Sequence, residues 1–103
     1  MNRNTTANRS DEMYRAILEL KDLEECKLFF EDLCAMTELR SIEQRFEVAK
    51  MLREENVYTE IMQKTGASSA TISRVNRMLQ YGNGSMRRIL GRMAEKEAPQ
   101  KEE

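Results

Sequence analysis

Apolar residues recur along most of the chain at intervals of three and four, the spacing that places them on one face of an α-helix. The longest such series is Leu39, Ile42, Phe46, Ala49 and Leu52. It predicts the longest helix, with Thr37 as its N-cap and the polar segment Glu54–Asn56 at its end. No segment alternates apolar and polar residues with the period of two that strands show. The pattern therefore predicts an all-α fold of five to six helices.

Shorter apolar series predict the other helices. Ser10 or Asp11 can cap the first helix, and the second helix covers about residues 23–35. The apolar arc of the second helix is too wide for one neighbour to cover, which is typical of burial on two sides, as in a dimer interface. Two short helices are expected at about residues 58–65 and 68–81.

Glycine and proline mark the boundaries of the C-terminal part. The segment Gly82–Gly84 breaks the chain, Ser85 is expected to cap a last helix, and Pro99 is expected to end it. The length of 103 residues predicts one domain. The expected organisation is a disordered arm (1–10), a helical domain (11–97) and a polar tail (98–103), and the helical domain comprises dimerisation helices (11–36), a helix-turn-helix (58–81) and a C-terminal helix (85–97).

The segment around Gly66 has the features of a helix-turn-helix. Gly66 tolerates the left-handed conformation that ends a helix in a tight turn, and Ser68 can cap the helix that follows. Thr71 stands where an ordinary capping box carries a glutamate, so no carboxylate lies at this helix start. Three apolar residues are spaced so as to lock the two helices where they cross: Ile61, Ile72 and Val75.

Charge is distributed unevenly along the chain. The net charge is only −1, with a pI near 5.7, but residues 61–94 contain six Lys and Arg and no Asp or Glu. A nucleic-acid backbone is a polyanion, so a surface that lies against it must lack carboxylates as well as carry cations. Screening keeps the field of such a surface local, so an acidic body does not prevent binding. This acid-free segment (residues 61–94) indicates a nucleic-acid surface.

The second helix of the predicted helix-turn-helix begins with small polar side chains and continues with arginines. Small residues allow the N-terminal end of a recognition helix to enter the major groove and read base edges. The partner indicated is double-stranded DNA. The residues expected to contact DNA are Ser68, Ser69, Ala70, Thr71, Ser73, Arg74 and Arg77. The candidates for contacts to phosphate are Lys64, Tyr58, Arg87 and Arg88.

Other features narrow the classes of function. The chain has no histidine, no Gly-rich phosphate loop and no nucleophile–base pair, so neither an enzyme nor a metal site is expected. The spacing of Cys26 and Cys34 fits neither a redox motif nor a zinc site, and both are expected to be reduced. No apolar run reaches the roughly 18 residues of a membrane span and no signal-peptide pattern is present, so the expected location is the cytoplasm.

The segment Gln44–Leu79, and above all Ala70-Thr71-Ile72-Ser73-Arg74, resembles the Trp-repressor superfamily, specifically its small TrpR-related branch from Gram-positive bacteria. The resemblance covers about residues 37–84, and the first third of the chain matches only in helical pattern. It implies an intertwined homodimer that presents two recognition helices to successive major grooves. The implied function is sequence-specific transcriptional regulation, as a repressor.

The resemblance also implies where a ligand would lie. The Trp repressor holds tryptophan between two arginines, with a glycine that leaves room for the indole and a serine near the polar end of the ligand. Arg74 matches one arginine, but Gln44, Val75 and Met78 replace the other arginine, the glycine and the serine. Loss of a cation–π partner together with added bulk disfavours the ligand. Tryptophan is therefore not expected as a cofactor, and the existence of another small-molecule effector stays open.

A second class of function stays open from the residues alone. The methionine and leucine residues on helical faces are compatible with a helical protein–protein interaction module that assembles without touching DNA. Binding to duplex DNA separates the two hypotheses.

Overall fold

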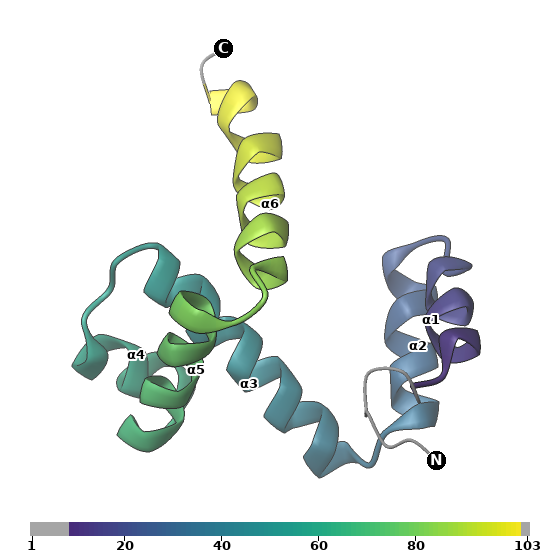
Figure 1. The fold of residues 1–103 in the computed structure, drawn as a ribbon, viewed down its shortest axis with the longest axis horizontal. Coiled ribbons are helices and arrows are strands. Elements are labelled where there is room, and N and C mark those ends of the chain that lie inside the picture. Colours follow the sequence, from purple (N-terminus) through teal and green to yellow (C-terminus); the bar gives the residue numbers. More distant parts are fainter. Residues whose placement is uncertain (1–8, 102–103) are drawn as a thin grey trace. The chain divides into compact units, whose positions relative to one another are not determined.

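The computed structural model describes the backbone of residues 9–101 and the side chains of residues 9–97 (Figure 1). This part of the chain folds into six helices and contains no strand, so the prediction of an all-α fold is confirmed. The helices are α1 (Asp11–Leu18), α2 (Leu23–Leu33), α3 (Met36–Arg53), α4 (Tyr58–Thr65), α5 (Ser69–Tyr81) and α6 (Ser85–Lys101). None of the described helices is both long and apolar enough to cross a bilayer.

The chain divides into two compact units, and α3 runs from the first into the second. Unit 1 comprises residues up to Leu39, and unit 2 begins at Arg40. Most of the predicted N-terminal arm, residues 1–8, lies outside the described residues, as do residues 102–103 of the predicted tail.

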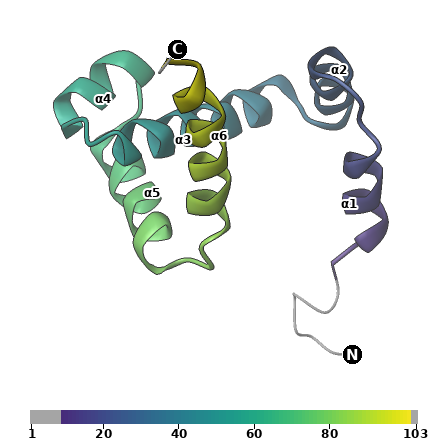
Figure 2. The same cartoon turned by 90° about the horizontal axis from the view of Figure 1, so that it is seen from above.

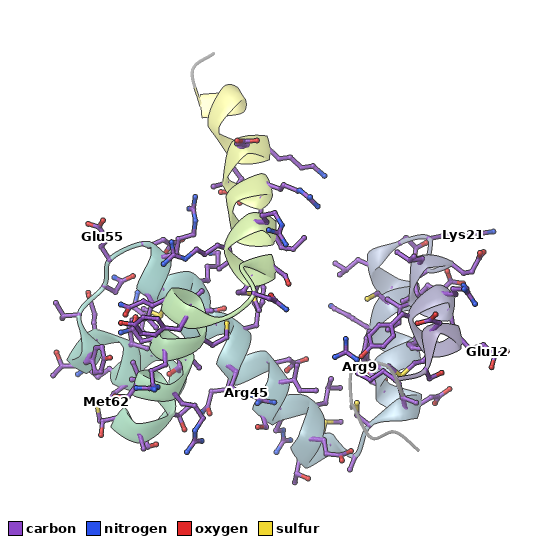
Figure 3. The ribbon with its side chains drawn as sticks, viewed as in Figure 1. Arg9, Glu12, Lys21, Arg45, Glu55 and Met62 are labelled. Carbon is purple, nitrogen blue, oxygen red and sulfur yellow. The ribbon has the colours of Figure 1, made fainter. Side chains whose placement is uncertain are left out.

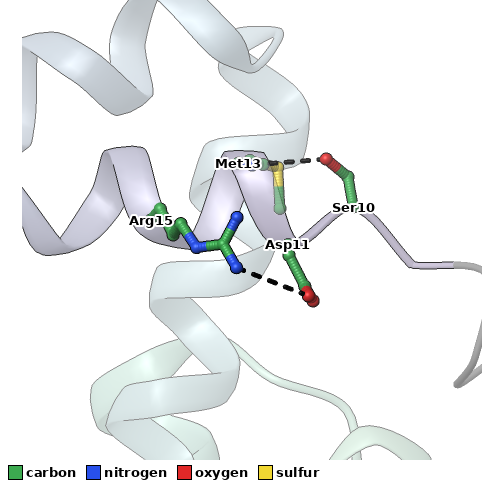
Figure 4. A network of polar contacts seen from close by, with 4 residues as sticks. All are labelled: Ser10, Asp11, Met13 and Arg15. Carbon is green, nitrogen blue, oxygen red and sulfur yellow. Dashed lines mark hydrogen bonds and ion pairs between the residues drawn. The ribbon is translucent and has the colours of Figure 1, made fainter.

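Unit 1 is held locally by caps at its helix starts. The Ser10 hydroxyl accepts a hydrogen bond of 3.3 Å from the Met13 N–H, and Arg15 approaches Asp11 to 3.9 Å (Figure 4). Asp22 caps α2 in the same way by accepting from the Glu25 N–H at 2.8 Å. The capping role expected of Ser10 is thus confirmed. Neither α1 nor α2 contains a buried residue.

Unit 2 contains the hydrophobic core. The fully buried Ile61 of α4 and Ile72 of α5 lie where these two helices pack, as predicted, and Val75 is buried beside them. The C-terminal half of α3 and residue Leu90 of α6 complete the core. Figures 1 and 2 show α4 and α5 against this half of α3, with α6 running back from the end of α5. The core residues are Val48, Ala49, Met51, Ile61, Ala67, Ile72, Val75 and Leu90.

Three expected helix boundaries are wrong. Thr37 lies inside α3, which begins at Met36. The start of this helix is capped instead by the Glu38 carboxylate, which accepts a hydrogen bond of 2.8 Å from the Ala35 N–H. Ser85 is the first residue of α6 rather than its cap, because Asn83 Oδ1 accepts from both the N–H and the hydroxyl of Ser85. Helix α6 continues past Pro99 to Lys101, so Pro99 does not end it.

Candidate nucleic-acid interface

The turn between α4 and α5 is built around Gly66. This residue has φ of 75°, a left-handed conformation that a side chain would strain, and its N–H donates to the Met62 carbonyl at 2.9 Å. The Thr65 hydroxyl donates to the Ile61 carbonyl at 2.7 Å and accepts from the Ala67 N–H at 3.1 Å. The hydroxyl therefore connects the last turn of α4 to the residue that follows Gly66, and it satisfies a backbone N–H in a partly buried turn.

A side chain from α3 fixes the same turn from outside. The Gln44 amide donates to the Thr65 carbonyl at 3.0 Å in a partly buried setting. This contact joins α3 to the end of α4, two elements that are separated along the chain. Sequence reasoning missed the structural roles of Gln44 and Thr65, because neither residue type signals a bond between distant segments.

The start of α5 has the cap that the sequence predicts. The Ser68 hydroxyl accepts from the Thr71 N–H at 3.1 Å and lies 3.2 Å from the Thr71 hydroxyl, to which it donates. The first turn of α5 contains no acidic residue. The partial positive charge of the helix N-terminus is therefore not neutralised by a local carboxylate.

The residues expected to contact DNA lie on one helix and its cap, and nearly all are exposed. Ser68, Ser69, Ala70, Ser73, Arg74 and Arg77 are exposed, and Thr71 is half-buried because it takes part in the cap. Within residues 9–97, neither Arg74 nor Arg77 pairs with a carboxylate. Their guanidinium groups thus remain available to an anionic partner.

The four candidates for phosphate contacts come from two helices. Tyr58 and Lys64 lie on α4, at its start and in its last turn, and both are exposed. Arg87 and Arg88 lie on the first turns of α6 and are also exposed. Arg87 differs from the others because its Nε–H donates to the Leu79 carbonyl at 2.7 Å and so caps the end of α5. Its charged group is therefore held by the fold.

The positions that correspond to the tryptophan pocket are occupied differently in this chain. Val75 is only 3% exposed and belongs to the core, and Gln44 is engaged with the Thr65 carbonyl. Met78 lies one turn further along α5 and is partly exposed. Of the four positions, Arg74 alone carries the residue that the Trp repressor uses, and its side chain is exposed.

Comparison with known proteins agrees with this geometry. The family model of the Trp repressor protein matches residues 8–94. YerC of Bacillus subtilis (strain 168) is 55% identical over 87 residues, which cover 84% of this chain and 84% of YerC. The fold and its turn define a helix-turn-helix DNA-binding regulator, a class without enzymatic activity.

Two solved structures share the fold. A TrpR-like protein from Eubacterium eligens ATCC 27750 has a TM-score of 0.83 at 52% identity, with 88% of this chain and 96% of that chain covered. A candidate Trp repressor from Staphylococcus aureus has a TM-score of 0.82 at 46% identity, with 90% and 96% covered. The chain belongs to the Trp repressor family.

Proposed function

We propose that this protein is a homodimeric, sequence-specific DNA-binding repressor that reads the major groove with the N-terminal half of α5. The observation that supports this most strongly is the start of α5, where small exposed side chains and two unpaired arginines surround a helix N-terminus without carboxylates. An α-helix with such an end fits the major groove, and its serine hydroxyls and Ala70 methyl suit base edges. The repressor role rests on family membership, since a bound dimer blocks the DNA that it covers.

The proposed division of labour among residues follows their positions. Ser69, Ala70, Ser73 and Arg77 lie toward the bases, where hydroxyl, methyl and guanidinium groups discriminate among base pairs. Lys64 and Tyr58 on α4 and Arg87 and Arg88 on α6 contact phosphates, which position the protein but carry no sequence information. Arg74 can serve either purpose because of its length.

The dimer is proposed from the apolar surface of unit 1. Leu18, Leu23, Leu28 and Leu33 are 52–82% exposed in the single chain, and no residue of α1 or α2 is buried. Burying a leucine side chain stabilises a protein by about 1.5–3 kcal/mol, so contact with a second apolar surface would stabilise unit 1 most. A second copy of the chain supplies one with the same composition. In unit 2, Ile89 and Met93 of α6 are also exposed apolar side chains.

We expect sedimentation equilibrium at micromolar concentration to give twice the single-chain mass of 12.1 kDa. Leu28→Lys places a charge on the apolar face of α2 and should shift the equilibrium toward the monomer. The matched control is Gln63→Lys, which adds a lysine at an exposed polar position of α4. A folded 12.1 kDa monomer of the unmodified chain at this concentration contradicts the proposed dimer.

We expect DNA binding to weaken log-linearly with salt, because cations of the protein displace counterions from phosphates. About three phosphate contacts per protomer give a slope of about −5 in a plot of log K against log salt. Fluorescence anisotropy with labelled duplexes from 50 to 200 mM salt, roughly the range over which such slopes are measured, provides the test. No binding to any duplex at low salt instead favours the helical interaction module.

Selection of bound sites from a random duplex library then tests the sequence specificity of the same protein. A dimer of recognition helices should select a palindrome with half-sites about one helical turn apart. Enrichment without a palindrome contradicts the symmetric docking of two α5 helices.

We expect no tryptophan binding by calorimetry at millimolar ligand. Val75 fills the space where the indole would lie, and Gln44 supplies no guanidinium to stack on it. Because Gln44 also holds the Thr65 carbonyl, a ligand that displaced it would leave a partly buried carbonyl without its partner. Saturable heat with tryptophan, absent with alanine as the matched amino acid, contradicts this proposal.

A further inference from the structure

A pocket within unit 2 is lined by none of the four positions that correspond to the tryptophan pocket. It has a volume of about 510 Å³ and lies between the C-terminal ends of α3 and α5 and the first turns of α6. Arg53 of α3 and Arg87 of α6 both line it. Glu55, which is labelled in Figure 3, lies on the connection between α3 and α4. Its carboxylate also lines the pocket.

Arg87 is held in place by a contact within the fold. Its Nε–H donates to the Leu79 carbonyl at 2.7 Å, one of the carbonyls that the end of α5 leaves without a helical partner. This bond uses one of the five N–H donors of the guanidinium, so its terminal nitrogens remain for a ligand. Fixing the side chain in advance lowers the entropy that a ligand would otherwise lose on binding.

Arg53 approaches the same pocket from α3. Its Nη2 lies close to Gly91 of α6, where an added Cβ would come within 3.7 Å of it. Within the described residues, neither Arg53 nor Arg87 forms an ion pair with a carboxylate, although Glu55 lines the same pocket. Two guanidinium groups, of which that of Arg87 is held by the fold, line one pocket with a single carboxylate, so the site carries a net positive charge.

The rest of the lining suits the remainder of a small polar molecule. Asn76 and Gln80 of α5 are one turn apart and offer amide donors and acceptors, and Leu52 and Leu79 contribute apolar surface. Guanidinium forks match the paired oxygens of carboxylates and phosphates. We propose that this pocket binds a small metabolite with an oxyanion group, held by Arg53 and Arg87 and oriented by Asn76 and Gln80.

The pocket and the reading surface share one helix. The metabolite would contact the C-terminal half of α5, whose N-terminal half carries the residues proposed to lie at the bases. It would also connect α5 to α6 and α3, and so restrain the helix that carries the reading surface. The binding site itself does not depend on the DNA assignment, because its occupancy is measured without DNA.

The test is a nuclear magnetic resonance titration of the full chain with inorganic phosphate at constant ionic strength. We expect saturable shifts at the side-chain amides of Asn76 and Gln80 and at the Nε–H of Arg87. A parallel titration with sodium acetate distinguishes a phosphate group from a carboxylate as the oxyanion that binds. Saturation by phosphate identifies a phosphorylated ligand, and saturation by acetate identifies a carboxylate.

Arg53→Gln should weaken this binding at least about fivefold, because it removes one of two charge-assisted partners. The matched control is Arg92→Gln, which removes an exposed arginine of α6 that does not line the pocket. It should change the affinity less than about twofold, as expected for a screened surface charge. Shifts that stay linear in both anions, or that fall equally in the two variants, overturn the proposal.

Discussion

Replacing Ala70 by glutamate is expected to lower DNA affinity about 100-fold or more, because a carboxylate brought against phosphates costs several kcal/mol. Ala70 is exposed in the first turn of α5, where no acidic residue occurs. In the free protein the same substitution should be neutral or slightly stabilising. A negative charge in the first turn of a helix is favourable by about 0.3–1 kcal/mol, so the variant should unfold at the same or a slightly higher temperature.

The control for Ala70→Glu is Tyr81→Glu, which adds the same charge at an exposed position at the other end of the same helix. Eleven residues of α-helix span about 16 Å, which exceeds the screening length of about 8 Å at physiological salt. We therefore expect Tyr81→Glu to change DNA affinity less than about threefold, since screened charges interact weakly. Fluorescence anisotropy gives the affinities and circular dichroism the melting temperatures.

Two outcomes contradict the proposed orientation of α5. If both variants bind DNA equally well, the N-terminal half of α5 does not face the duplex. If Ala70→Glu instead lowers the melting temperature strongly, the loss of binding reflects unfolding. The opposite signs expected for stability and affinity separate a contact with DNA from a role in the fold.

Much of unit 2 could be predicted from the sequence because its determinants are local. Gly66 ends a helix, Ser68 starts the next, and Ile61 and Ile72 recur at the spacing that brings two helices together. All of these features lie within one short segment of the chain, residues 61–72. The helix-turn-helix therefore follows from backbone conformation, capping and apolar periodicity, without knowledge of the remaining chain.

The errors at helix boundaries arise from capping by neighbouring side chains. Thr37 and Ser85 have the residue types that favour an N-cap, but Glu38 and Asn83 satisfy the free N–H groups instead. Several polar residues compete for the same donors within a few positions. The sequence therefore predicts that a boundary exists more reliably than it predicts the residue at which the helix begins.

The contacts that sequence reasoning missed join distant segments. Gln44 reaches the Thr65 carbonyl across 21 positions, and Arg87 reaches the Leu79 carbonyl across the turn between α5 and α6. Only the packed arrangement of α3, α4, α5 and α6 brings these groups together. Gln44 is an example. It stands where the Trp repressor has a ligand-binding arginine, and in this chain it has a structural role in the turn instead.

The contrast between the two units has a physical cause. Among the residues with described side chains, unit 2 buries eight apolar residues, whereas α1 and α2 of unit 1 bury none. A pair of short helices without a core is marginally stable by itself, since most helical stability in proteins comes from tertiary packing. The wide apolar arc expected for residues 23–35 thus remains uncovered in the single chain, which agrees with the proposed dimer.

Replacing Ile61 by alanine is expected to lower the free energy of unfolding by about 2–5 kcal/mol, the cost of removing a buried isoleucine from a packed core. Ile61 is 0% exposed and lies at the packing of α4 against α5. Domains of this kind have a total stability of only about 5–15 kcal/mol, so the variant loses a large share of it. Urea unfolding followed by circular dichroism measures the change.

Val57→Ala is the matched control, because Val57 lies one helical turn before Ile61 and is 63% exposed. Its removal should change the stability by no more than about 0.5 kcal/mol, as is usual for surface substitutions. All variants are compared at one protein concentration, because the stability of a dimer depends on concentration. Equal losses in Ile61→Ala and Val57→Ala mean that the core is not centred on the crossing of α4 and α5, and the orientation proposed for the reading helix then loses its structural support.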